Sequence, residues 1–118
     1  MSNATDHILG NRTIVIGIND SLQVGGDQVL QVGRNAASEV QSNRSVKVGK
    51  DMKLVVGKHL VIQAGDSLTL QVGAARLTLK KDGSIVLQGK DISIEGSGKV
   101  NVKSAGDVVL KGSKILQN

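Results

Sequence analysis

Residues 43–74 read NRSVKVGK, DMKLVVGK, HLVIQAGD and SLTLQVGA, four octads in direct succession. Each octad has an apolar residue at its fourth place, another at its sixth place and a glycine at its seventh. Side chains two residues apart lie on the same face of a β-strand, and glycine is favoured where a chain bends sharply. The stretch therefore predicts short strands that turn a corner every eight residues and wind around an axis.

The same octad pattern extends back to residue 11 through NRTIVIGI, NDSLQVGG, DQVLQVGR and NAASEVQS. Glycine follows every apolar pair except one, where Gln41 takes its place, and Asn or Asp often opens the next octad, as residues that tolerate corner conformations should. The core residues predicted to face the axis in residues 11–74 are Ile14, Ile16, Leu22, Val24, Leu30, Val32, Val40, Val46, Val48, Leu54, Val56, Ile62, Leu70 and Val72.

After Gly73 the phase of the pattern changes, because the next apolar pair follows after seven residues instead of eight. A second seven-residue step follows later, and Lys81-Asp82-Gly83 reads as a turn between the two steps. We expect a one-residue change to be absorbed at a corner, since otherwise the core face would turn outward. The predicted core residues of this part are Leu77, Leu79, Ile85, Leu87, Ile92, Ile94, Val100, Val102, Val108 and Leu110.

These patterns predict two segments of one rod. Residues 11–74 form the regular octad segment, and residues 75–118 form a less regular one that ends in a tip. Residues 1–4 are interpreted as a vector remnant, and residues 5–10 as a linker to an upstream domain that the chain lacks.

The composition supports a thin and regular core. The 118 residues include 15 glycines but no Phe, Trp, Tyr, Pro or Cys. A core without aromatic residues must be built from small aliphatic side chains, and the absence of proline suits backbones whose N–H groups are used in ladders. The absence of cysteine excludes a disulfide framework. Helices are disfavoured, because residues two apart do not share a helix face.

The formal net charge of +5 could indicate nucleic-acid binding. The basic residues are scattered singly along the chain, however, and no aromatic side chain is present to stack on a base. We interpret them as a solvated outer face that discourages aggregation, and we expect no nucleic-acid partner.

A chain of this kind could close its own coils or share them with other chains. A single-chain β-solenoid, with three octads to a coil, should show a period of about 24 residues because its three faces differ. The sequence shows period eight without that modulation. This favours an all-β, intertwined homotrimeric triangular β-helix whose core exists only in the assembled state. A single-chain solenoid that acts as a binding module is the alternative.

Little in the sequence suggests catalysis. His7 and His59 are the only histidines, and the carboxylates are spread along the chain without a recognisable pair. We expect no enzyme activity, no cofactor and no metal site. Ser38 is unusual because it occupies an inward place, where three hydroxyl groups of a trimer would meet and need hydrogen bonds.

At the V-G octads the chain resembles the valine-glycine repeat protein (VgrG) spikes of type VI secretion systems. The same needle architecture occurs in the membrane-puncturing spikes of contractile-tailed phages, and a phage tail spike needle is the close alternative. The resemblance covers about residues 14–116, and the closing GDVVLKGSKILQN is similar to the end of many such spikes. The pattern departs from the family at Gln41 and through residues 75–106.

The resemblance implies a trimeric β-prism needle that punctures membranes and lies below a hub domain, through which it would meet the secretion tube protein. It also implies a PAAR-repeat cap on the blunt C-terminal end, with effectors carried into target cells. By position, the residues that would contact the cap are Lys114, Ile115, Leu116, Gln117 and Asn118. Such a spike would be assembled in the bacterial cytoplasm, secreted through the type VI apparatus, and would meet the target membrane only transiently.

Overall fold

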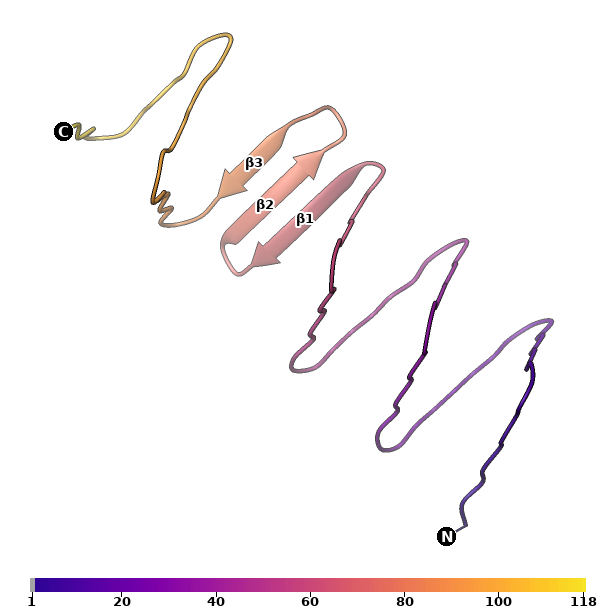
Figure 1. Cartoon of the computed structure of the whole chain (residues 1–118). Helices are drawn as coiled ribbons and strands as arrows, with labels where there is room; N and C mark the ends of the chain where they lie inside the picture. The colour runs from indigo at the N-terminus through magenta and orange to yellow at the C-terminus, as the bar shows by residue number, and fades with distance from the viewer. Residues whose placement is uncertain (1) are drawn as a thin grey trace. The chain divides into compact units, whose positions relative to one another are not determined.

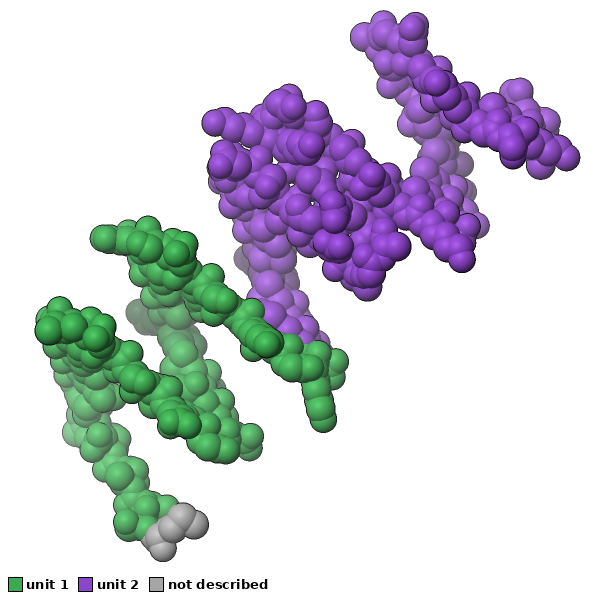
Figure 2. Space-filling model, turned by 180° about the vertical axis from the view of Figure 1, so that it is seen from behind, with its two compact units in different colours: residues 1–51 green, residues 52–118 purple. Residues whose placement is uncertain are grey.

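The computed structural model describes residues 2–118, which form extended segments joined by bends (Figure 1). The chain divides into two units, Met1–Asp51 and Met52–Asn118 (Figure 2). Each unit is described by itself below.

The first unit is extended chain interrupted by a bend every eight residues. The bends lie at residues 9–10, 17–18, 25–26, 33–34, 41–42 and 49–50. The predicted corners of the octads in this unit are therefore confirmed, and the chain bends at Gln41 although glycine is missing there. No segment within residues 2–51 pairs with another as a β-strand.

The second unit continues the bends at 57–58 and 65–66 and then forms a sheet. Three strands make it up in the order β1-β2-β3: β1 (Ser67–Val72), β2 (Ala75–Lys80) and β3 (Ile85–Gln88). Both pairings are antiparallel, so residues 67–88 form a β-meander (Figure 1). Bends return beyond the meander at 90–91, 97–98, 105–106 and 113.

The first seven-residue step is a hairpin and not a corner of the winding. Val72 pairs with Ala75, which leaves Gly73 and Ala74 as a two-residue connection in which Gly73 has φ of 54°. The chain therefore reverses direction here, whereas the sequence pattern predicted that a corner would absorb the change of phase. Reversal through a two-residue connection pairs residues an odd number apart, which explains the seven-residue step.

The turn predicted at Lys81-Asp82-Gly83 is present between β2 and β3. Lys80 N donates to Ser84 O at 3.0 Å, and Gly83 N donates to Lys80 O at 3.0 Å. Gly83 has φ of 94°, a region that residues with a Cβ rarely adopt. The backbone conformation itself therefore favours glycine at this position.

The glycines at the corners of the octads differ in backbone conformation from the glycines in the turns of the meander. In the described chain, residues 2–118, only Gly73 and Gly83 have a positive φ, and no other residue type does. A Cβ added at Gly49 or Gly57 would meet no atom within 4 Å. The corner conformations expected to need glycine, Asn or Asp therefore do not need a left-handed backbone.

A single chain has no core of its own. None of residues 2–118 is buried, and the chain exposes 13538 Å². A compact monomer of 12.3 kDa exposes roughly 6,100 Å², and the unfolded chain roughly 17,800 Å². The lone chain thus still exposes most of the surface that a compact fold would bury, and burial that could stabilise the fold must come from other chains.

Candidate functional site

The meander gathers its apolar side chains on one face. Cross-strand partners lie on the same face of an antiparallel sheet, and so do residues two apart in a strand. The register pairs Leu68 with Leu79 and Leu70 with Leu77, and it pairs Leu77 with Leu87 and Leu79 with Ile85. The apolar sheet face is therefore formed by Leu68, Leu70, Val72, Ala75, Leu77, Leu79, Ile85 and Leu87.

The opposite face of the meander is mainly polar. It carries Thr69, Gln71, Arg76, Thr78 and Lys80, which alternate with the apolar residues along β1 and β2. One sheet face is thus suited to solvent and the other to burial. The apolar face lacks cover in the lone chain, where Leu79 is 37% exposed and Leu70 57%.

Leu68 is a member of this face that the sequence reasoning missed. It occupies the second place of its octad, and only the fourth and sixth places were assigned to the core. The signal was nevertheless present, because places two, four and six share a face of a strand. Met52 and Leu60 occupy the same second place in the two preceding octads.

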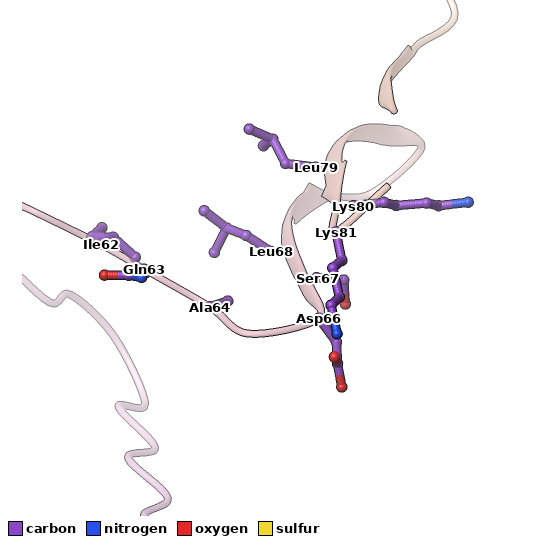
Figure 3. A pocket seen from close by; sticks show the side chains of 9 residues that line it. All are labelled: Ile62, Gln63, Ala64, Asp66, Ser67, Leu68, Leu79, Lys80 and Lys81. Carbon is purple, nitrogen blue, oxygen red and sulfur yellow. The ribbon is translucent and has the colours of Figure 1, made fainter. Parts of the chain in front are cut away.

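A groove of about 230 Å³ lies beside the apolar sheet face, where the octad of residues 59–66 leads into β1. Ile62, Ala64, Leu68 and Leu79 form its apolar part. Figure 3 shows the side chains of Leu68 and Leu79 projecting to the same side, whereas Lys80 points the opposite way. Packing at the density of a protein interior would require further side chains in this space.

In two of the octads, the exposed fraction of the side chain differs clearly between neighbouring apolar residues. Val56 is 43% exposed and its neighbour Val55 76%, while Ile16 is 47% exposed and Val15 87%. The predicted core places are thus the less exposed ones in these octads. Contact with other chains is what would define a core residue, so the core assignments of residues 14–72 and 77–110 stay predictions.

Two polar features accompany these surfaces. Ser84 N donates to Asp82 Oδ1 at 2.9 Å, and this hydrogen bond lowers the pKa of the Asp82 carboxyl below its ordinary value. Arg44 Nη1 donates to Ser38 Oγ at 3.5 Å, across the corner at Gln41. The hydroxyl that the sequence marked as unusual therefore has a partner within its own chain.

The predicted tip residues follow the bend at residue 113 as extended chain. Ile115 is 61% exposed and Leu116 81%, so both apolar side chains are available to another protein. Their contact with a cap stays a prediction. Among residues 2–118 there is no group of three or more His, Cys, Asp or Glu side chains that could hold a metal ion. The same part of the chain contains no helix of the length and hydropathy that a membrane span requires.

These observations define a class of protein. A chain with extended octads, a corner at each eighth residue and no internal core is one strand of a β-helix that several chains build together. Residues 2–80, about two thirds of the chain, match the family described as the bacteriophage T4 gp5 C-terminal trimerisation domain, and the chain belongs to this family.

Family membership makes the chain part of a homotrimeric, phage-tail-spike-like β-helical needle with a structural role. The predicted all-β homotrimer is thereby confirmed. The single-chain solenoid lacks support, because the octads of residues 11–66 form no strand ladder with one another within either unit. A search among curated proteins finds no match to the chain.

Proposed function

We propose that this chain is the shaft of a type VI secretion spike of the VgrG family, with a mechanical and not an enzymatic role. The observation that carries the proposal is the eight-residue spacing of the bends along residues 2–66, which are extended and form no strand ladder with one another. Three intertwined chains pair every strand laterally and leave no free sheet edge. Such a shaft is stiff, and stiffness is what puncturing a membrane requires.

The C-terminal end is proposed to carry a PAAR-repeat cap on Lys114, Ile115, Leu116, Gln117 and Asn118. Three copies of Ile115 and Leu116 would present six apolar side chains at one end of the needle, and both are exposed in the lone chain. An exposed apolar cluster of this size favours a protein partner. Effectors would travel with the cap, and the secretion tube protein would contact an upstream hub.

In this proposal the spike assembles in the bacterial cytoplasm and leaves through the secretion apparatus into the target cell. It crosses the target membrane transiently and is not anchored there. The family match supports a spike, and the V-G octads support the secretion variant.

Cap binding is tested with a tagged PAAR-repeat protein and three forms of the trimer: intact, lacking residues 115–118, and Lys58→Glu. Lys58 lies at an octad corner, so its variant controls for a surface change away from the tip. We expect the intact trimer and Lys58→Glu to retain the cap, and the truncated trimer to lose it while remaining trimeric. Equal retention by all three forms would move the docking site elsewhere.

A phage tail spike needle is the second candidate, favoured by the printed description of the matching family. The two candidates differ in what the native spike assembles with. Purification of the spike from its native cell should recover a secretion tube protein together with a PAAR-repeat cap. Recovery of tail proteins packaged in phage particles would instead support the phage candidate.

A further inference from the structure

The meander is the part of the chain that pairs its own backbone. Within residues 2–118, the two strand ladders and the connecting bonds all lie in residues 66–88, including Lys81 N to Asp66 O at 2.9 Å. The octads before it are extended without such partners. Backbone N–H and C=O groups must be paired when they are buried, so the octads can be buried only after other chains arrive.

The meander can form early because its contacts are local. A two-residue connection joins β1 to β2, and four residues join β2 to β3. Short connections have a low entropy of closure, and local contacts form faster than distant ones. Three strands with one apolar face also meet the usual minimum for a sheet that persists in water. The octads, in contrast, can pair their backbones only after separate chains meet.

The apolar sheet face continues a surface that belongs to the trimer. The trimerisation family match runs to residue 80 and therefore includes both β1 and β2. Ile85 and Leu87 of β3 extend the same face beyond that match. The occupant that fits it is the same face of the other two copies, since three apolar faces turned toward a common axis cover one another.

The octads leave the register of the three chains poorly defined. Because their pattern repeats every eight residues, sliding one chain by a whole octad would again bring apolar places opposite apolar places. Such a slip would lose apolar contacts mainly at the two ends of the octad segment. The meander, in contrast, occurs once in the chain. One seven-residue step leads into β2, from Leu70 to Leu77, and another leads out of β3, from Ile85 to Ile92. A slipped chain would set a meander against an octad.

We propose that residues 67–88 are the element through which three copies first associate and which sets their register. The apolar sheet face of each copy packs against those of the other two, and the octads then wind from that point. This inference rests on the trimer and goes beyond the proposed secretion role, because it holds equally for a phage spike.

Paired substitutions in the full chain test the order of assembly. Leu77→Ala removes side-chain atoms from the apolar sheet face, Leu54→Ala removes the same atoms from an octad, and Thr78→Ala changes the polar face of β2. Refolding after dilution from denaturant is followed by circular dichroism at several protein concentrations. We expect Leu77→Ala to slow refolding tenfold or more, and the other two variants to change its rate by less than about threefold. Equal slowing by Leu77→Ala and Leu54→Ala would overturn the proposal.

Pulse-labelled hydrogen exchange on the unsubstituted chain gives a second measurement that does not depend on any variant folding. We expect peptides from residues 67–88 to become protected before those from residues 11–66. Simultaneous protection, or earlier protection of the octads, contradicts the proposal.

Register is read from valine and leucine methyl NMR spectra, in which three equivalent chains give one set of signals. The unsubstituted trimer should show a single set, and refolded Leu77→Ala should show additional sets. A single set from Leu77→Ala would show that the octads set the register without the meander.

Discussion

Leu70 lies directly opposite Leu77 in the hairpin of β1 and β2, although the two are seven positions apart in the chain. In one continuous strand, residues seven apart would point to opposite faces. The reversal at Gly73 restores both side chains to the same face. A step that looks irregular in the sequence thereby keeps the apolar surface continuous.

The substitution Val56→Asp is expected to prevent assembly of the trimer. Val56 is the less exposed of the two adjacent valines, at 43%. A trimer would bring three carboxylates into one apolar layer, where an unpaired charge costs several kcal/mol. Light scattering should detect free chains in place of three associated chains of 12.3 kDa.

The matched control is Lys58→Glu, two residues away at the next corner, which should leave the trimer intact. A soluble, heat-resistant trimer of the Val56→Asp variant would show that the inward assignment of the octads is wrong.

The substitution Gly83→Val is expected to destabilise the turn between β2 and β3. The φ of 94° at Gly83 is rarely adopted by residues with a Cβ, and such strain costs roughly 1–3 kcal/mol per chain. Gly83→Asn should cost less, because asparagine tolerates positive φ better than a β-branched residue does. The midpoint of thermal unfolding should fall in the order unsubstituted, Asn, Val. Equal midpoints for all three would contradict the turn geometry.

The stability of the same turn is expected to depend on pH through Asp82. Its hydrogen bond with Ser84 N lowers the pKa of the carboxyl in the folded state, so the ionised form stabilises the fold. This contribution is complete above the ordinary pKa of 3.8 and is lost as the pH falls through the lower pKa of the folded state.

Unfolding midpoints of the unsubstituted chain and Asp82→Asn should therefore differ at pH 6 and converge near pH 2. A difference that persists at pH 2 would show that the carboxylate charge is not its source.

The substitution Ser38→Val is expected to stabilise the trimer. If Ser38 is inward, an apolar side chain there adds about 1 kcal/mol of burial per chain. The substitution also removes the 3.5 Å hydrogen bond that Arg44 donates to Ser38, and this loss opposes the gain from burial. The hydrogen bond is exposed to solvent in the lone chain. Thermal unfolding measures the net change.

Ser45→Val, at an outward place of the next octad, provides the control and should have little effect. A lower unfolding midpoint for Ser38→Val than for the unsubstituted chain would indicate that the Ser38 hydroxyl belongs to a polar network on the axis.

The octads show how far local pattern alone can predict this protein. The spacing of apolar residues and glycine placed a corner at every eighth residue, and through residue 66 the bends occur there, including the one at Gln41 where glycine is absent. The bend at Gln41 indicates that the alternation of the whole octad, and not one glycine, determines where the chain turns. The absence of a 24-residue period also pointed correctly to a trimer.

The hairpin could not be predicted in the same way. A seven-residue step is compatible with a distorted corner or with a reversal, and the apolar pattern of residues 70–79 is the same in both. Leu68 was missed for a related reason, since the repeat appeared to assign two inward places to each octad. Strand alternation would have placed it on the same face as Leu70, and its pairing with Leu79 shows that it lies there.

The sequence by itself determined the all-β class, the corner spacing and the need for partner chains, because side-chain alternation and glycine placement act over a few residues. Only the tertiary structure decided that β1, β2 and β3 pair within one chain and collect their apolar side chains on a common face. That choice depends on which backbone groups meet across the Gly73 and Gly83 turns. The pairing of these backbone groups depends on the direction that the chain takes after each turn, and the spacing of residues does not specify that direction.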